Sequence, residues 1–265
     1  MPSAPPSADS LTMEQAARSA RDASRRLRAM PGELRDVALH RIARQIREAR
    51  TEIQAANAKD LERARSDGIS QPLVSRLSLS EVKMKTIDAS LQDVAAASDP
   101  LKQVQMVREI DDDLILTRVT VPIGVIGVIF ESRPDALVQI ASLCIKSGNA
   151  AILKGGSEAA ASNQALFDCI EMALAATDSG FAGALHLATN RCQIDDLLRM
   201  DDLVDLIIPR GSPDLVRSIQ DRTRIAVLGH ADGICHVYVD AAADLEQAVA
   251  IVTDAKTEYP AVCNA

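Results

Sequence analysis

The residue best suited to chemistry is Cys263, in the stretch TEYPAVCNA at the end of the sequence. A thiol that follows a helix and a proline-bearing turn can meet backbone N–H groups, which lower its pKa and make it a nucleophile. The alternative is a small buried side chain, the usual state of a free cysteine. That alternative fits Cys144 and Cys169, which lie in amphipathic helical patterns, and Cys235, which lies in an expected strand. No periodic apolar pattern surrounds Cys263, so both interpretations of it stay open.

A second group of candidates follows the expected strands, in the turns ESRP, KGGS and PRGS. Ligands bind at the carboxyl ends of the strands in an open parallel sheet. Lys154 could bind a ribose or a phosphate there. The glycines of Gly155-Gly156 and Gly211-Ser212 are expected to leave backbone N–H groups open at a helix start, which suits phosphate. Glycines after strands are also ordinary turn residues, and the sequence has no GxGxxG motif, so this pattern fits a nucleotide site and a plain turn equally well.

The rest of the sequence indicates the elements that must position these residues. Residues 11–95 have helical patterns, as in PGELRDVALHRIARQIREAR, where apolar residues recur with charges between them. The β-branched runs QVQMVREI and LILTRVTV flank three aspartates and predict a hairpin with an acidic turn. From about residue 123, strand and helix patterns alternate, which indicates βαβ units. The expected fold class is α/β, with a Rossmann-like parallel sheet, N-terminal helices and a protruding hairpin.

Composition excludes several classes of function. The net charge of −8 argues against nucleic-acid binding, which needs a basic surface. The five cysteines include no CxxC pair, which argues against a disulfide framework or a zinc site and fits a reducing, cytoplasmic compartment. The most apolar run, VTVPIGVIGVIF, is too short to cross a membrane as a helix. Adjacent aspartates at 111–113 point apart, so we expect no metal site there.

Three blocks of the sequence carry a resemblance to a known family. They are VTVPIGVIGVIFESRPDALVQIASLCIKSGNAAILKGGSEA, VLGHADGICHVYVD and YPAVCNA. They resemble the gamma-glutamyl phosphate reductase family, also called glutamate-5-semialdehyde dehydrogenase, within the aldehyde dehydrogenase superfamily. The resemblance runs from about residue 11 to the end. It implies NADPH-dependent reduction of L-glutamyl 5-phosphate to L-glutamate 5-semialdehyde and phosphate, the second step of proline biosynthesis.

The resemblance also implies a mechanism and roles for three residues. Cys263 becomes the catalytic nucleophile, which attacks the acyl phosphate, expels phosphate and leaves a thioester that hydride from the nicotinamide reduces. The oxyanion formed on the way needs hydrogen-bond donors. Ser132 falls where the superfamily has an asparagine that supplies one. Arg133 could bind the substrate carboxylate or phosphate, although a surface ion pair explains it equally well.

The residues expected to contact NADPH are Lys154, Gly211 and Ser212. Lys154 falls where the superfamily's cofactor-binding lysine falls. Aldehyde oxidisers of the superfamily carry a glutamate before a Leu-Gly pair to activate water, whereas this sequence has Val227 there. An apolar residue cannot act as a general base. The substitution therefore favours an acyl-phosphate reductase, which needs no hydrolytic water.

The family's chain continues well beyond the cysteine, so we expect this chain to be a partial enzyme whose full-length form is a homo-oligomer. Two alternatives remain: a non-catalytic nucleotide-binding fragment, and a related aldehyde or acyl-phosphate dehydrogenase. The expected organisation has four parts. We expect a flexible leader at residues 1–10, a discontinuous NADP-binding domain at residues 11–103 and 122–229, an oligomerisation hairpin at residues 104–121, and the beginning of a catalytic domain at residues 230–265.

Overall fold

The structure is a computed structural model that describes residues 11–131, 133–190, 192–229 and 235–257. The predicted leader, Ser132 and Cys263 lie outside these residues. The chain divides into two compact units, Met1–Leu228 and Gly229–Ala265. Each unit is described by itself. Within the described ranges, no helix combines the length and the apolar character needed to cross a membrane.

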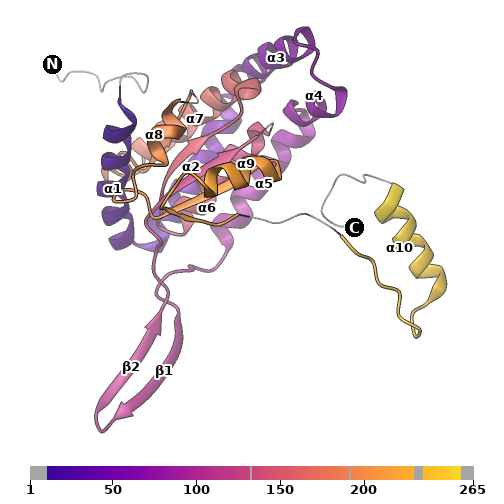
Figure 1. Cartoon of the computed structure of the whole chain (residues 1–265). Coiled ribbons are helices and arrows are strands. Elements are labelled where there is room, and N and C mark those ends of the chain that lie inside the picture. Colours follow the sequence, from indigo (N-terminus) through magenta and orange to yellow (C-terminus); the bar gives the residue numbers. More distant parts are fainter. Residues whose placement is uncertain (1–10, 132, 191, 230–234, 258–265) are drawn as a thin grey trace, which may run out of the picture. The chain divides into compact units, whose positions relative to one another are not determined.

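Within the described residues, the first unit contains helices, strands and short 3-10 turns in the order shown in Figure 1. The helices are α1 (Met13–Ala29), α2 (Gly32–Glu48), α3 (Arg50–Ser66), α4 (Gln71–Leu77), α5 (Glu81–Ala96), α6 (Pro134–Lys146), α7 (Ala160–Ala175), α8 (Cys192–Leu197) and α9 (Pro213–Gln220). The 3-10 turns are η2 (Ser157–Ala159) and η3 (Ser179–Phe181). The strands are β1 (Val104–Asp111), β2 (Leu114–Val119), β3 (Val125–Phe130), β4 (Ala150–Lys154), β5 (Leu185–Leu187), β6 (Leu206–Arg210) and β7 (Ala226–Val227).

A five-stranded parallel sheet with the order β5-β4-β3-β6-β7 forms the centre of the first unit. The chain leaves β3 for β4 and β5 on one side and returns to place β6 and β7 on the other. The order therefore reverses between β3 and β6, where doubly wound folds bind ligands. Every residue of β3 and β4 is buried, as the continuous apolar runs in the sequence predict. The predicted α/β fold with a Rossmann-like sheet is confirmed.

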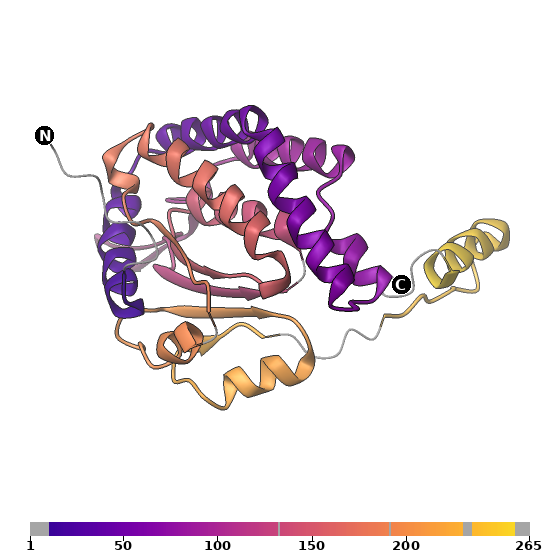
Figure 2. The same cartoon turned by 90° about the horizontal axis from the view of Figure 1, so that it is seen from above.

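Helices cover both faces of the sheet (Figure 2). On one face, α6 and α7 lie between the sheet and the N-terminal helices α2, α3 and α5, while α8 and α9 lie on the opposite face. Side chains cap α1, α5 and α9 at their first turns. At α1, Thr12 accepts from the backbone N–H of Gln15, and the Gln15 side chain accepts from the backbone N–H of Thr12. Cys144 and Cys169 are buried in α6 and α7, as predicted.

The predicted hairpin forms from β1 and β2, which pair antiparallel and extend away from the rest of the first unit (Figure 1). Asp113 occupies its turn with a φ of 60°. The hairpin's apolar side chains face solvent; Val107 is 62% exposed and Ile115 is 63% exposed. Such a two-stranded ribbon gains little stability from its own contacts.

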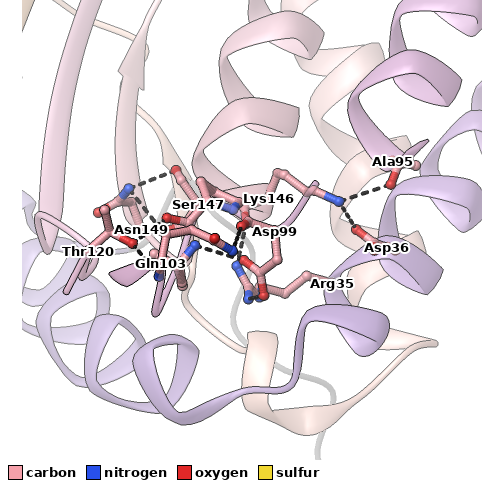
Figure 3. Close-up of polar contacts among 11 residues, drawn as sticks. Arg35, Asp36, Ala95, Asp99, Gln103, Thr120, Lys146, Ser147 and Asn149 are labelled. Carbon is pink, nitrogen blue, oxygen red and sulfur yellow. Dashed lines mark hydrogen bonds and ion pairs between the residues drawn. The ribbon is translucent and has the colours of Figure 1, made fainter. Parts of the chain in front are cut away.

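A network of hydrogen bonds holds the base of the hairpin against the helices (Figure 3). The Arg35 guanidinium on α2 lies 2.8 Å from the Asp99 carboxylate. The Gln103 side chain donates to the backbone carbonyl of Asp99 at 2.9 Å, and the Gln103 backbone N–H donates to the Thr120 hydroxyl at 2.9 Å. Both strands of the hairpin are therefore fixed to the first unit at their base.

The described part of the second unit consists of residues 235–240, a turn and α10 (Leu245–Thr257). Asp244 caps α10 by accepting from the backbone N–H of Gln247 at 2.9 Å. The strand expected around Cys235 is wrong, because residues 235–240 have no strand conformation. A strand needs the ladder hydrogen bonds of a neighbour, and no strand of the described chain pairs with this stretch.

Candidate functional site

The candidate site lies at the carboxyl edge of the parallel sheet. The paired positions Ile129–Lys154 and Phe130–Arg210 bring the ends of β4 and β6 to the two sides of β3. The buried Lys154 ends β4 and the exposed Arg210 ends β6. The two residues therefore lie on opposite sides of the end of β3, beside the turn that begins with Glu131. Two hollows open at this edge, one beside β4 and one beside β6.

Lys154 is the buried cation of this edge, with 9% of its surface exposed. Burial lowers the pKa of its ammonium group, because the charged form loses hydration, and the negative charge of Glu158 partly offsets this effect. The ammonium donates to the backbone carbonyl of Gly155. An ammonium group that keeps two further donors in a dehydrated place is suited to bind a ribose hydroxyl or a phosphate oxygen.

A small hollow of about 40 Å³ lies beside the turn that follows Lys154. It is lined in part by Gly155, Gly156, Ser157, Asn163 and Thr189. A Cβ atom on Gly155 would lie 2.2 Å from the Asn163 amide nitrogen, so only glycine fits there. Because neither glycine has a side chain, main-chain atoms of the pair line this hollow directly. This arrangement lets a ligand approach the turn closely.

The predicted phosphate site at the helix start after Gly155-Gly156 is wrong in one respect. The N-cap residue of α7 is Ala159, which has no side chain that can accept a hydrogen bond. Instead, Asp60 on α3 accepts from the backbone N–H of Ala161 at 3.2 Å and of Ser162 at 2.7 Å. These N–H groups are not open, because the Asp60 carboxylate, itself paired with Arg63, already accepts from them.

The turn Gly211-Ser212 precedes α9. Ser212 is the N-cap, and its hydroxyl accepts from the backbone N–H of Leu215 at 3.3 Å. A Cβ atom on Gly211 would lie 2.9 Å from the carboxyl carbon of Glu131, so the two turns approach closely here. Asp214 lies in the first turn of α9, and the Glu131 carboxylate lies beside Gly211. An acidic side chain therefore lies close to the helix start at both predicted phosphate-binding turns.

Arg133 is 57% exposed and lies 3.0 Å from the Asp135 carboxylate. The Lys83 ammonium lies 3.9 Å from the other oxygen of Asp135. Burial lowers the pKa of Lys83, with the charge of Asp135 opposing and that of Arg133 reinforcing the shift. The ion pair considered for Arg133 from the sequence is therefore present. It occupies one nitrogen of the guanidinium and leaves the group free to meet a ligand as well.

The larger hollow, about 680 Å³, is bounded by α6, β3, β6 and the base of the hairpin. Its charged end contains Glu131, Arg133 and Arg210. Elsewhere its lining is largely apolar, with Ile126, Val128, Ile140, Leu143 and Ile208. An apolar hollow with a few polar groups at one end is the usual form of a small-molecule site.

The structure thus separates the predicted residues into two groups. Lys154 lies at the end of β4, beside its glycine turn. Arg133 lines the larger hollow together with Arg210, which ends β6 directly before Gly211 and Ser212. Ser132 and Cys263 lie outside the described residues.

Comparison with known proteins agrees with this architecture. The model of the aldehyde dehydrogenase family matches residues 3–260. The chain belongs to the aldehyde dehydrogenase family. It is 54% identical over 232 residues to a gamma-glutamyl phosphate reductase of Synechococcus sp. (strain CC9902), covering 87% of this chain and 53% of that protein. It is 57% identical over 214 residues to one of Prochlorococcus marinus (strain MIT 9303), covering 81% of this chain and 49% of that protein.

The crystal structure of gamma-glutamyl phosphate reductase from Thermotoga maritima has the same fold, with a TM-score of 0.88 and 34% identity. The match covers 96% of this chain and 61% of that one. The chain therefore spans about half the length of the curated relatives that it matches.

Sequence reasoning assigned no role to three side chains of this edge: Asp60, Glu131 and Arg210. The signal for Arg210 was available, since it immediately precedes Gly211 at the end of an expected strand. No such signal was available for Asp60, because about a hundred residues separate it from the helix start that it caps. Only the packing of α3 beside α7 brings the two together.

Proposed function

We propose that this chain carries the cofactor-binding half, and the start of the catalytic domain, of a gamma-glutamyl phosphate reductase. The reaction is the reduction of L-glutamyl 5-phosphate with NADPH to L-glutamate 5-semialdehyde and phosphate, a step of proline biosynthesis. The observation that carries the proposal is the identity of 54% over 232 residues to an enzyme of that name. The cations and glycine turns at the carboxyl edge of the sheet support it.

The residues that would hold the cofactor are Lys154, Gly211 and Ser212. Their character fits a dinucleotide, because Lys154 is a buried cation and the turn of Gly211 and Ser212 directly precedes α9 at the carboxyl edge of the sheet. NADPH supplies a hydride when bound. The protein's part is to fix the position of the cofactor and to exclude water from it. The preference for NADPH over NADH is part of this proposal.

The charged end of the larger hollow would hold the substrate. L-glutamyl 5-phosphate carries a carboxylate and a phosphate, and two guanidinium groups, on Arg133 and Arg210, line that end. Guanidinium groups bind both kinds of anion through paired hydrogen bonds. We assign Arg133, as predicted, and Arg210 to this task.

Cys263 remains the proposed nucleophile and Ser132 the proposed donor to the oxyanion. The Cys263 thiolate would form a bond to the acyl carbon, and the bond from that carbon to the phosphate oxygen would break, which releases phosphate and leaves a thioester. Phosphate is a good leaving group, so this step needs no proton transfer to it. A general base for water is likewise unnecessary, in agreement with Val227 at the position before Leu228.

The hairpin is the proposed oligomerisation element, with its exposed apolar residues meeting another subunit. Residues 230–265 are proposed to begin the catalytic domain. We place the enzyme in the cytoplasm, where free thiols such as those of Cys144, Cys169 and Cys192 stay reduced.

The test is the reverse reaction on the 265-residue chain, followed as phosphate-dependent reduction of NADP by glutamate 5-semialdehyde. The expected result is a phosphate-dependent rate that the Cys263→Ala variant lacks. NADPH binding is measured in parallel by fluorescence. Binding without a rate would favour the alternative of a nucleotide-binding fragment, since the chain spans about half of its relatives. Absence of both binding and rate would overturn the proposal for this chain.

A further inference from the structure

The side chain of Asp60 is a buried charge that the proposed reaction does not use. It is 1% exposed and lies on α3, far in sequence from the sheet edge. A buried carboxylate is costly unless it is fully paired. The partners of Asp60 therefore reveal what its burial achieves.

Four hydrogen bonds satisfy the Asp60 carboxylate. Its Oδ2 atom accepts from the backbone N–H and from the hydroxyl of Ser162, each at 2.7 Å. Its Oδ1 atom accepts from the backbone N–H of Ala161 at 3.2 Å and from the Arg63 guanidinium at 3.0 Å. Asp60 thus acts as the N-cap of α7 from another helix, because the N-cap residue Ala159 offers no acceptor.

Arg63 extends the contact to the turn that follows β4. The same Nη2 atom that meets Asp60 also donates to the backbone carbonyl of Ser157 at 2.8 Å. Ser157 follows Gly155-Gly156 and lines the small hollow. The segment that follows the two glycines is therefore held at two points, at Ser157 by Arg63 and at the start of α7 by Asp60.

Asn57, one turn before Asp60 on α3, completes the arrangement. Its side-chain amide donates to the Ser162 hydroxyl at 3.0 Å and to the Leu77 carbonyl at 2.8 Å, and its oxygen accepts from the backbone N–H of Leu79 at 2.8 Å. Asn57 and Ser162 are both buried. Asn57 thereby links the segment between α4 and α5 to the contact between Asp60 and Ser162.

We propose that Asp60 and Arg63 are positioning residues, which hold the Gly155–Ser157 turn in the shape that receives the nucleotide. The inference rests on the proposed cofactor role of Lys154 and its turn. A turn fixed before binding loses less conformational entropy when the ligand arrives, so the contact increases affinity without touching the ligand.

The test compares NADPH affinity in single variants of the 265-residue chain, beside their thermal stability. Arg63→Ala is the informative change, because the side chain is 48% exposed and the three hydrogen bonds from Ala161 and Ser162 to Asp60 do not involve it. We expect the dissociation constant for NADPH to rise about threefold to tenfold, as for one lost hydrogen bond. Arg63→Lys, which can still donate to the Ser157 carbonyl, should recover part of the loss. Arg65→Ala is the matched control, an exposed arginine on the same helix.

Hydrogen exchange of the free protein tests the same step without a ligand. The amides of residues 155–162 should exchange faster in Arg63→Ala than in Arg65→Ala, while β3 stays equally protected. Equal NADPH affinities and equal exchange in these two variants would overturn the positioning role. Lys154→Ala separates this outcome from failure of the cofactor site. If Lys154→Ala binds NADPH as wild type does, or if wild type does not bind it, the assigned cofactor site fails and the positioning role fails with it.

Discussion

The guanidinium of Arg35 lies 2.8 Å from the carboxylate of Asp99, and this ion pair joins α2 to the segment that leads into the hairpin. Arg35 is 2% exposed and also donates to the backbone carbonyl of Lys146 (Figure 3). The contact thus connects α2, α6 and the hairpin base at one point.

Replacing Arg35 with alanine should lower the free energy of unfolding by about 2–4 kcal/mol, because a buried pair is broken while Asp99 keeps some contact with water. Chemical denaturation measures this. The control is Arg44→Ala on the same helix, where a solvent-exposed pair with Glu48 should contribute little to the free energy of unfolding. Equal effects of the two changes would show that the hairpin base is not held in this way.

Gly124 should tolerate no side chain. Its φ is +132°, and a Cβ atom would lie 2.0 Å from the Asp205 carboxylate, which accepts from Arg21 and from the backbone N–H of Val125. We expect Gly124→Ala to cost about 3 kcal/mol or more in thermal or chemical unfolding. Gly68→Ala is the matched control, since Gly68 also has a positive φ but open space around it, and it should cost about 1 kcal/mol.

Acid should destabilise the fold through His186. Burial lowers the pKa of His186 to about 4 from 6.5, partly opposed by a hydrogen bond with the backbone of Gly183. The unfolded chain therefore binds a proton first as the pH falls. The contribution of neutral His186 to the free energy of unfolding is complete above about pH 6.5. The free energy of unfolding then decreases by on the order of 2–3 kcal/mol towards pH 4. Unfolding free energies measured across this range should fall less steeply in His186→Gln. An unchanged slope would contradict the assignment.

The described thiols should differ in reactivity. Burial raises the pKa of Cys144 to about 12 and, with nearby carboxylates, that of Cys169 to about 11, whereas Cys192 is exposed. Because the thiolate is the reactive form, iodoacetamide near neutral pH should label Cys192 and spare the two buried residues until denaturant is added. Peptide mass spectrometry identifies the sites, and its result for Cys263 bears on the proposed nucleophile.

The hairpin should carry subunit association without contributing to the stability of the first unit. Val107→Asp with Ile115→Asp places charges on two side chains that are more than half exposed. We expect loss of any oligomer in sedimentation velocity and an unchanged melting temperature at low protein concentration. Glu109→Gln, on the same strand as Val107, is the control. Dissociation in neither variant, from an oligomer present in wild type, would exclude the hairpin as the interface.

The sequence by itself determined the elements and their order. Periodic apolar residues identified the helices, the continuous run in β3 identified a buried parallel strand, and the acidic turn after β1 identified the hairpin. These are local properties, decided by side-chain pattern and turn chemistry over a few residues. The same locality explains why Lys154 and the Gly211-Ser212 turn could be chosen as site residues, because each directly follows a strand.

Only the tertiary structure decided which chemical groups remain available at that edge. The N–H groups after Gly155-Gly156 look open in sequence, yet Asp60 occupies those of Ala161 and Ser162. Likewise, the strand expected at Cys235 depended on a neighbour that the described chain does not provide. Hydrogen bonds between residues far apart in sequence depend on how helices and strands pack. A local pattern states what a segment can form, whereas packing decides which of its polar groups are already paired.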